Sequence, residues 1–245
     1  MSYPLFNQVP TSLKTLYTMI LIVLGIGYVF ALIQIYEVQA GRDGRPGLSV
    51  EDIRIAYSGS KADTRLEIAL KGPMAGMLPG AERQRIFDWV RKDRASESAY
   101  QADIKPIVET RCKACHNGAN PHIPSLISYD ELSKMVVLDT GVSVGTLVRV
   151  SHIHLFGITF IFGFMGLVFC HAHMRSHVLK NVIIAMPFVA IILDIASWWL
   201  TKVSTPFAYV VVVGGGLMGI SFAVQWTVSM YQMWLAKTPP PREGS

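Results

Sequence analysis

The chain has 245 residues, of which 51% are hydrophobic and only 16% are charged. Its mean hydropathy is positive, which is unusual for a soluble globular domain and argues for a membrane protein. The formal net charge of +5 at pH 7 is modest, so the composition gives no reason to expect nucleic-acid binding.

Four apolar runs are long enough to cross a bilayer, whose core needs about 20 residues of helix. The runs span residues 16–36, 153–170, 182–200 and 207–235. The first is longer than the apolar region of a cleaved signal peptide, so we expect it to stay as an anchor. The fold class predicted is all-α, a four-transmembrane-helix bundle with a polar domain inserted after its first helix.

The inserted segment, residues 37–147, is predicted to be helical, because it contains no convincing strand pattern. Ser49, with an aspartate three residues later, is typical of a helix N-terminus. A stretch rich in glycine and proline, residues 72–80, predicts irregular turns. Amphipathic helices are predicted on either side of the following polar loop, over residues 81–92 and 100–115.

The second of these helices leads into the pattern C-x-x-C-H at residues 112–116. This pattern is the attachment signature of a c-type haem. Cys112 and Cys115 would react with the two vinyl groups of one porphyrin, and His116 would be the proximal iron ligand. The sequence therefore predicts one covalently attached haem c.

Other kinds of site that contain a C-x-x-C pattern require surrounding residues that this sequence lacks. A thioredoxin-like site requires a βαβ arrangement, and a zinc ribbon requires a second pair of ligands at suitable spacing. A disulfide between Cys112 and Cys115 would leave His116 without a role. The third cysteine, Cys170, ends an apolar run and is interpreted as a buried thiol.

The polar segment resembles a small mono-haem cytochrome c of the class I type, which begins with a helix running into C-x-x-C-H. Such a protein ends with a methionine-bearing loop and a closing helix. Residues 100–116 are similar to the opening helix and motif, and residues 72–90 to the methionine loop and closing helix. The two halves occur here in exchanged order. The membrane part carries no such resemblance.

The resemblance implies that Met74, or Met77 in the same loop, is the sixth iron ligand. A thioether ligand raises the reduction potential relative to a second histidine. Met135 and His122 compete with them, because they follow the motif, where the usual order places this ligand. Methionine also commonly fills core space, and that alternative stays open for each methionine.

Haem attachment takes place outside the cytoplasm, which predicts a periplasmic haem domain and cytoplasmic termini in a bacterial inner membrane. The short segments then assigned to the cytoplasm are rich in basic residues: Lys14, Arg175, Lys180, Lys237 and Arg242. The short external loop carries Lys202 alone, in agreement with the positive-inside rule. The predicted divisions are an anchor over 1–36, a haem c domain over 37–147, a three-helix membrane region over 148–237 and a tail over 238–245.

Ionisable residues inside membrane helices are costly and tend to be functional. His152 and His154 begin the second run, and Asp194 lies in the third. Counting about 1.5 Å per residue places Asp194 near the level of His154, so we expect a hydrogen bond between them. Such a pair would support a haem ligand, a copper or zinc site, a quinol pocket or helix packing.

A second group of histidines, His171, His173 and His177, follows the second run. We interpret it as part of a basic loop, with metal binding as an alternative.

The expected function is single-electron transfer by a membrane-anchored c-type cytochrome, an electron carrier rather than a stand-alone enzyme. Four helices exceed what anchoring requires, so we expect the bundle to dock into a larger respiratory, photosynthetic or oxidase complex. The redox donor and acceptor would be periplasmic or in the membrane. Two alternatives stay open: a structural subunit with an accessory haem, and a quinol dehydrogenase in which His154 and Asp194 accept protons.

Overall fold

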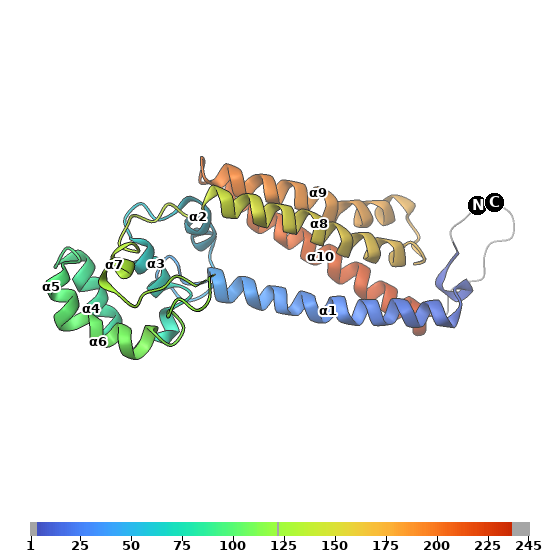
Figure 1. Cartoon of the computed structure of the whole chain (residues 1–245). Coiled ribbons are helices and arrows are strands. Elements are labelled where there is room, and N and C mark those ends of the chain that lie inside the picture. Colours follow the sequence, from blue (N-terminus) through green and yellow to red (C-terminus); the bar gives the residue numbers. More distant parts are fainter. Residues whose placement is uncertain (1–3, 122, 237–245) are drawn as a thin grey trace. The chain divides into compact units, whose positions relative to one another are not determined.

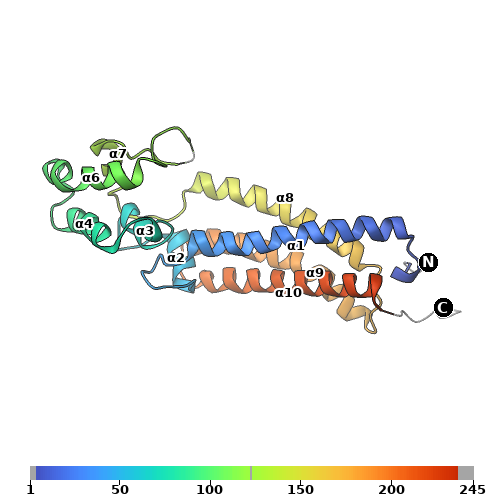
Figure 2. The same cartoon turned by 90° about the horizontal axis from the view of Figure 1, so that it is seen from below.

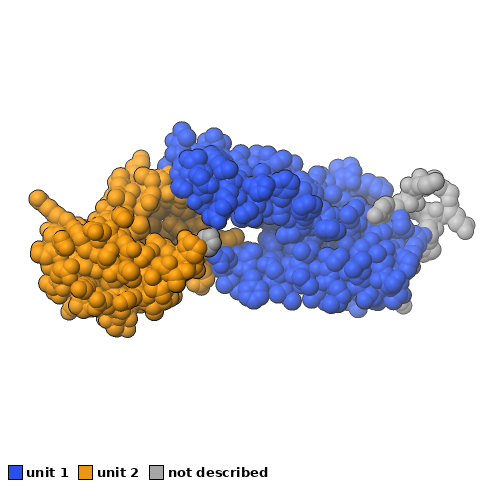
Figure 3. Space-filling model, viewed as in Figure 1, with its two compact units in different colours: residues 1–34, 143–245 blue, residues 35–142 orange. Residues whose placement is uncertain are grey.

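The structure, a computed structural model, describes residues 4–121 and 123–236. It divides into two compact units, coloured separately in Figure 3: a membrane unit of residues 1–34 and 143–245, and a polar unit of residues 35–142. The elements found in the described residues are helices, and the strand-like pairing consists of one isolated bridge between Thr64 and Leu138. The prediction of an all-helical chain is confirmed.

Four helices are long and apolar enough to cross a membrane (Figure 1): α1, Thr11–Gln39; α8, Val144–Phe169; α9, His177–Thr201; and α10, Phe207–Trp234. They confirm the four predicted spans. Three of them begin earlier than the predicted apolar runs, and in two of these, α8 and α9, a serine cap sets the first residue. Ser143 accepts a hydrogen bond from the amide of Thr146, and Ser176 accepts one from Leu179. Such caps satisfy amide groups that have no partner within the helix.

A proline in α9 leaves one backbone carbonyl without its helical hydrogen-bond donor, and a side chain of α10 replaces that donor. Pro187 has no N–H, so the carbonyl of Ile183, four residues earlier, loses its helical partner. The side-chain amide of Gln225 in α10 donates to this carbonyl at 3.0 Å. In a bilayer, a freed carbonyl needs such a partner from a neighbouring helix. The contact therefore fixes how α9 and α10 align.

Replacing Gln225 with leucine should lower the free energy of unfolding of the membrane unit by about 1 kcal/mol, the usual size of an interhelical hydrogen bond in a membrane. Reversible unfolding of the full chain in mixed detergent micelles would measure this. Thr227→Val is the control, because the Thr227 hydroxyl is exposed and bonds within its own helix to Ala223. Equal stability of the two variants would contradict the assignment.

Helix α1 packs along one side of α10. The indole N–H of Trp226 donates to the carbonyl of Leu21 at 2.7 Å, and Tyr28 stacks on Phe222 with ring centroids 4.1 Å apart. Leu21 is the buried residue of α1, whose other faces are largely exposed apolar surface. Figures 1 and 2 both place the C-terminal part of α10 beside the N-terminal part of α1.

The polar unit is built from short helices: α2, Val50–Ser58; α3, Arg65–Lys71; α4, Gly80–Arg91; α5, Glu97–Ala99; α6, Lys105–Ile107; and α7, Tyr129–Ser133. The predicted cap is confirmed, because the Ser49 hydroxyl accepts from the amide of Asp52 at 3.0 Å. The helices enclose a core cluster, which consists of Leu66, Leu70, Leu78, Ile86, Trp89, Tyr100, Ile104, Ile107, Val108, Leu126 and Leu132.

The helix that leads to the C-x-x-C-H motif is wound more widely than predicted. It contains two π-helical turns, Tyr100–Ile104 and Val108–Cys112, on either side of α6. Pro106 lies between them and has no N–H for an α-helical hydrogen bond. The helix ends at Cys112, three residues before the predicted end. The turn region predicted at residues 72–80 holds one 3-10 turn, Ala75–Met77.

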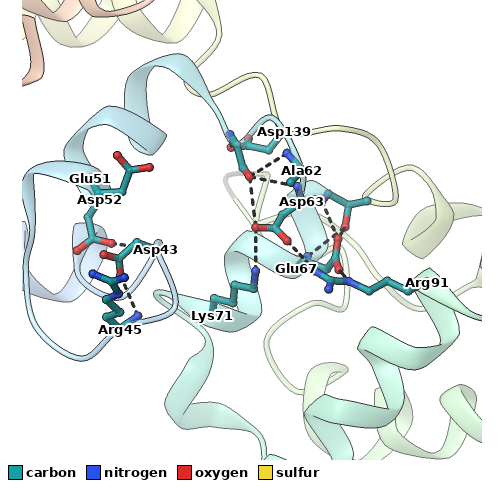
Figure 4. A network of polar contacts seen from close by, with 12 residues as sticks. Asp43, Arg45, Glu51, Asp52, Ala62, Asp63, Glu67, Lys71, Arg91 and Asp139 are labelled. Atoms are coloured by element: carbon teal, nitrogen blue, oxygen red, sulfur yellow. Dashed lines mark hydrogen bonds and ion pairs between the residues drawn. The ribbon is translucent and has the colours of Figure 1, made fainter. Parts of the chain in front are cut away.

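Ion pairs join α3 to α4 in the polar unit (Figure 4). The Arg91 guanidinium contacts Asp63 at 2.8 Å and also Glu67, and the Lys71 ammonium contacts Asp63 at 2.8 Å. The Glu67 carboxylate is almost completely buried and also accepts from the backbone and hydroxyl of Thr64. These charge-assisted bonds satisfy a carboxylate that would otherwise be costly to bury.

Candidate functional site

The C-x-x-C-H motif forms a tight turn at the end of the second π-helical turn. The amides of Cys115 and His116 both donate to the carbonyl of Cys112, at 3.2 and 2.9 Å. Cys112 is half-buried and packs against the core cluster, whereas Cys115 is exposed. Both are free thiols. Burial, and secondarily the nearby carboxylate of Glu82, raise the pKa of the Cys112 thiol.

The imidazole of His116 is held in one orientation by the loop that follows the motif. Its Nδ1 lies 2.7 Å from the carbonyl oxygen of Pro124. A carbonyl only accepts, so Nδ1 carries a proton, and in the neutral imidazole the lone pair is on Nε2. This is the arrangement by which a backbone carbonyl prepares a histidine to bind a metal through Nε2. The amide of Leu126 donates back to the carbonyl of His116 at 3.1 Å, which closes the loop.

Pro124 is a residue of the candidate site that the sequence interpretation did not single out. The signal for it is the dipeptide Asn117-Gly118, which favours a turn. Gly118 has a φ of 80°, and Asn117 Oδ1 accepts from the amide of Ala119 at 2.9 Å. This turn brings the chain back so that residue 124 can reach His116.

The candidate distal ligands differ in their surroundings. Met74 and Met135 are partly buried and pack against the same core cluster as Cys112. Met77 is 66% exposed. His122, the remaining candidate in this part of the chain, lies outside the described residues. Met74 and Met135 therefore share the apolar surroundings of the motif, and Met77 does not.

Aromatic side chains stiffen the core cluster behind the motif. Trp89 donates its indole N–H to the carbonyl of Ser96 at 3.0 Å. Tyr100 and Tyr129 are in contact with ring centroids 5.5 Å apart. Burial raises the pKa of the Tyr100 hydroxyl. Two thiols, a histidine with a free Nε2 and an adjacent apolar cluster are a donor set that fits a covalently bound haem.

The predicted hydrogen bond between His154 and Asp194 is not formed. His154 Nδ1 donates to the carbonyl of Val150 in its own helix at 2.8 Å, and its ring meets the edge of Trp198 with centroids 5.1 Å apart. Asp194 is buried against Gly214, and Trp198 is its polar neighbour. The prediction was wrong because the side chain of Trp198 contacts both residues.

The other membrane histidines are placed in two different environments. His152 is exposed and contacts Phe156 edge-on, with ring centroids 5.0 Å apart. His171 is buried, donates from Nδ1 to the carbonyl of Pro4 at 2.7 Å and accepts at Nε2 from Tyr17 at 3.2 Å. Both nitrogens of His171 are thus engaged by protein groups.

His173 and His177, which follow His171 in the chain, are exposed. In the part of the chain that the structure describes, no group of three side chains gathers that could hold a metal. The structure gives no support to metal binding by this group of histidines.

Fold and site together define a multi-pass, all-helical membrane protein with a polar unit that carries the C-x-x-C-H motif. Residues 137–240 match a family model described as a transmembrane helical domain. The match covers α8, α9 and α10 and agrees with their assignment as membrane helices. No curated protein and no solved structure matches the chain.

Proposed function

We propose that this protein is a membrane-bound c-type cytochrome with one covalent haem and that it transfers single electrons. The observation that carries the proposal is the hydrogen bond from His116 to Pro124, which leaves Nε2 free in the same turn that holds Cys112 and Cys115. When bound, the haem supplies an iron that changes between the Fe(II) and Fe(III) states.

The residues of the chain hold and tune this group. Cys112 and Cys115 attach it, and Pro124 orients His116 as the proximal ligand. The core cluster beside Cys112 excludes water from one side of the site, and exclusion of water is one of the means by which a protein sets a redox potential. Met74 is the proposed distal ligand.

The proposed setting is a bacterial inner membrane, with the polar unit periplasmic and both termini cytoplasmic. The large exposed apolar faces of α1 support docking against lipid and other subunits of a respiratory, photosynthetic or oxidase complex. The same faces would serve a structural subunit with an accessory haem. No hydrogen bond joins His154 to Asp194, so the quinol dehydrogenase alternative loses the support that this predicted pair would have given it.

A pyridine haemochrome spectrum of the purified full-length protein tests the proposal. We expect a c-type spectrum with one haem per chain, reduced by a soluble one-electron donor and not by a quinol. A chain isolated from cells with a working haem-attachment system, yet without covalent haem, would contradict the proposed function. Quinol-dependent reduction would favour the quinol dehydrogenase instead.

Replacing Met74 with leucine should remove the methionine-to-iron charge-transfer band of the oxidised protein and lower its reduction potential, because thioether ligation favours the reduced iron. Absorption spectroscopy and a redox titration would measure both effects. Met77→Leu is the matched control, since Met77 is exposed in the same loop. If Met135→Leu removes the band and Met74→Leu keeps it, the distal ligand is Met135 and the assignment to Met74 is wrong.

A further inference from the structure

Four polar side chains lie buried between two of the membrane helices. Asp194 of α9 is 5% exposed, and Ser221, Gln225 and Ser229 of α10 are at most 1% exposed. One oxygen of each, Asp194 Oδ1, Ser221 Oγ, Gln225 Oε1 and Ser229 Oγ, forms no hydrogen bond with any described residue. Buried polar atoms without a protein partner are commonly satisfied by internal water.

Two contacts set the register of α9 against α10. Gln225 donates to the carbonyl of Ile183, and a Cβ added to Gly214 would lie 3.2 Å from the Cβ of Asp194. The helices are antiparallel, so both contacts describe one alignment. In this alignment Ser221 lies opposite Pro187.

The three polar residues of α10 recur at every fourth position and lie on one face, about 6 Å apart along the helix axis. A water molecule with two hydrogen bonds of about 2.8 Å can bridge such an interval. From Ser221 to the level of Asp194 the distance is about 10 Å, which about three waters span. Internal waters can therefore connect Ser229, Gln225 and Ser221 to Asp194.

We call Asp194, Ser221, Gln225 and Ser229 the row of polar side chains. The row leads toward the end of α10 at Trp234. One turn beyond Ser229, the side chain of Gln232 exchanges hydrogen bonds with the backbone of His173, at 2.6 and 2.9 Å. His173 is exposed, so solvent is near at this end.

We propose that the row is a proton path along internal water between α9 and α10, which gives Asp194 access to solvent at the Trp234 end of α10. The Asp194 carboxylate takes up a proton to become the neutral acid and returns it along the same path. A carboxylic acid inside a membrane helix is costly, and proton relay is one of the functions that such residues serve. The path contains no residue of the proposed haem site.

The titratable groups on the other packed helices lie beside this row rather than in it. His154 of α8 contacts Trp198, the polar neighbour of Asp194. Tyr28 of α1 stacks on Phe222 of α10. Asp194 is thus the group between α9 and α10 that can exchange a proton.

Infrared spectroscopy of the full chain in lipid vesicles tests the path. The C=O stretch of protonated Asp194 is identified by its loss in Asp194→Asn, and its shift after transfer to D₂O reports proton exchange. Ser221→Val and Ser229→Val each remove a hydroxyl and fill its space. Each should slow the exchange about tenfold, equivalent to about 1.4 kcal/mol in the barrier. Thr227→Val, on the exposed side of α10, should exchange at the wild-type rate.

Circular dichroism and monodisperse elution show that each variant is folded before it is compared. The proposal is overturned if both serine variants exchange as fast as Thr227→Val. It is equally overturned if Asp194→Asn removes no carboxylic acid band at any pH from acid to neutral. A chain that lacks haem but keeps the path-dependent exchange would reject the proposed electron-transfer function and leave the proton path in place.

Discussion

Replacing Cys112 and Cys115 together with alanine is expected to abolish covalent haem attachment completely. In the proposed function the two thiols form the thioether bonds to haem, and both are free in the structure. His116 alone could at most bind haem reversibly. Haem staining after denaturing gel electrophoresis measures the effect, since a covalently attached haem stays with the chain.

The matched control is Cys170→Ala, which removes the remaining thiol from the membrane unit and should keep full staining. The double variant should still insert in the membrane, because its four apolar helices are unchanged. Wild-type staining of the double variant, or loss of staining in Cys170→Ala, would contradict the haem assignment.

Replacing Trp89 with alanine should destabilise the polar unit by about 3–5 kcal/mol, the usual cost of truncating a large buried aromatic side chain. Trp89 is 1% exposed in the core cluster, and its indole N–H donates to the carbonyl of Ser96. A domain is stable by about 5–15 kcal/mol, so the loss is a large share of the total. Pulse proteolysis of the full chain over a urea series, scored for cuts in residues 35–142, would measure it.

Two further variants separate the contributions of Trp89. Trp89→Phe keeps an aromatic ring and loses the hydrogen bond, so it should cost clearly less than Trp89→Ala. Met77→Ala removes an exposed side chain and should change stability by no more than about 0.5 kcal/mol. A Trp89→Ala protein as resistant as Met77→Ala would show that the core cluster does not stabilise the polar unit.

The membrane helices were predictable because the bilayer imposes one length and one composition on any helix that crosses it. Local caps such as Ser49 were predictable for a similar reason, since donor and acceptor are three residues apart. The pairing of Gln225 with Ile183 was not, because it depends on the rotation and register of two helices. The π-helical turns next to Pro106 were not predicted either, because the spacing of apolar residues was interpreted as that of an α-helix.

The residues of the candidate site also differ in whether the sequence alone could predict them. The thiols and His116 are contiguous in sequence, so a local pattern identifies them. Pro124 approaches His116 through a loop, and only the fold shows that its carbonyl is the partner. The predicted hydrogen bond between His154 and Asp194 is not formed, because the position of a residue along a helix gives its depth but not the direction of its side chain around the helix axis.

The pairing of α1 with α10 has a consequence for how the chain is made. Trp226 and Trp234 reach Leu21 and Thr18 across sequence separations of 205 and 216 residues. At 5–20 residues per second, the ribosome needs about 10–40 s to deliver these partners after the first helix has emerged. Residues 35–142 are complete well before then. The polar unit can therefore fold before the last membrane helix is available to pack against the first.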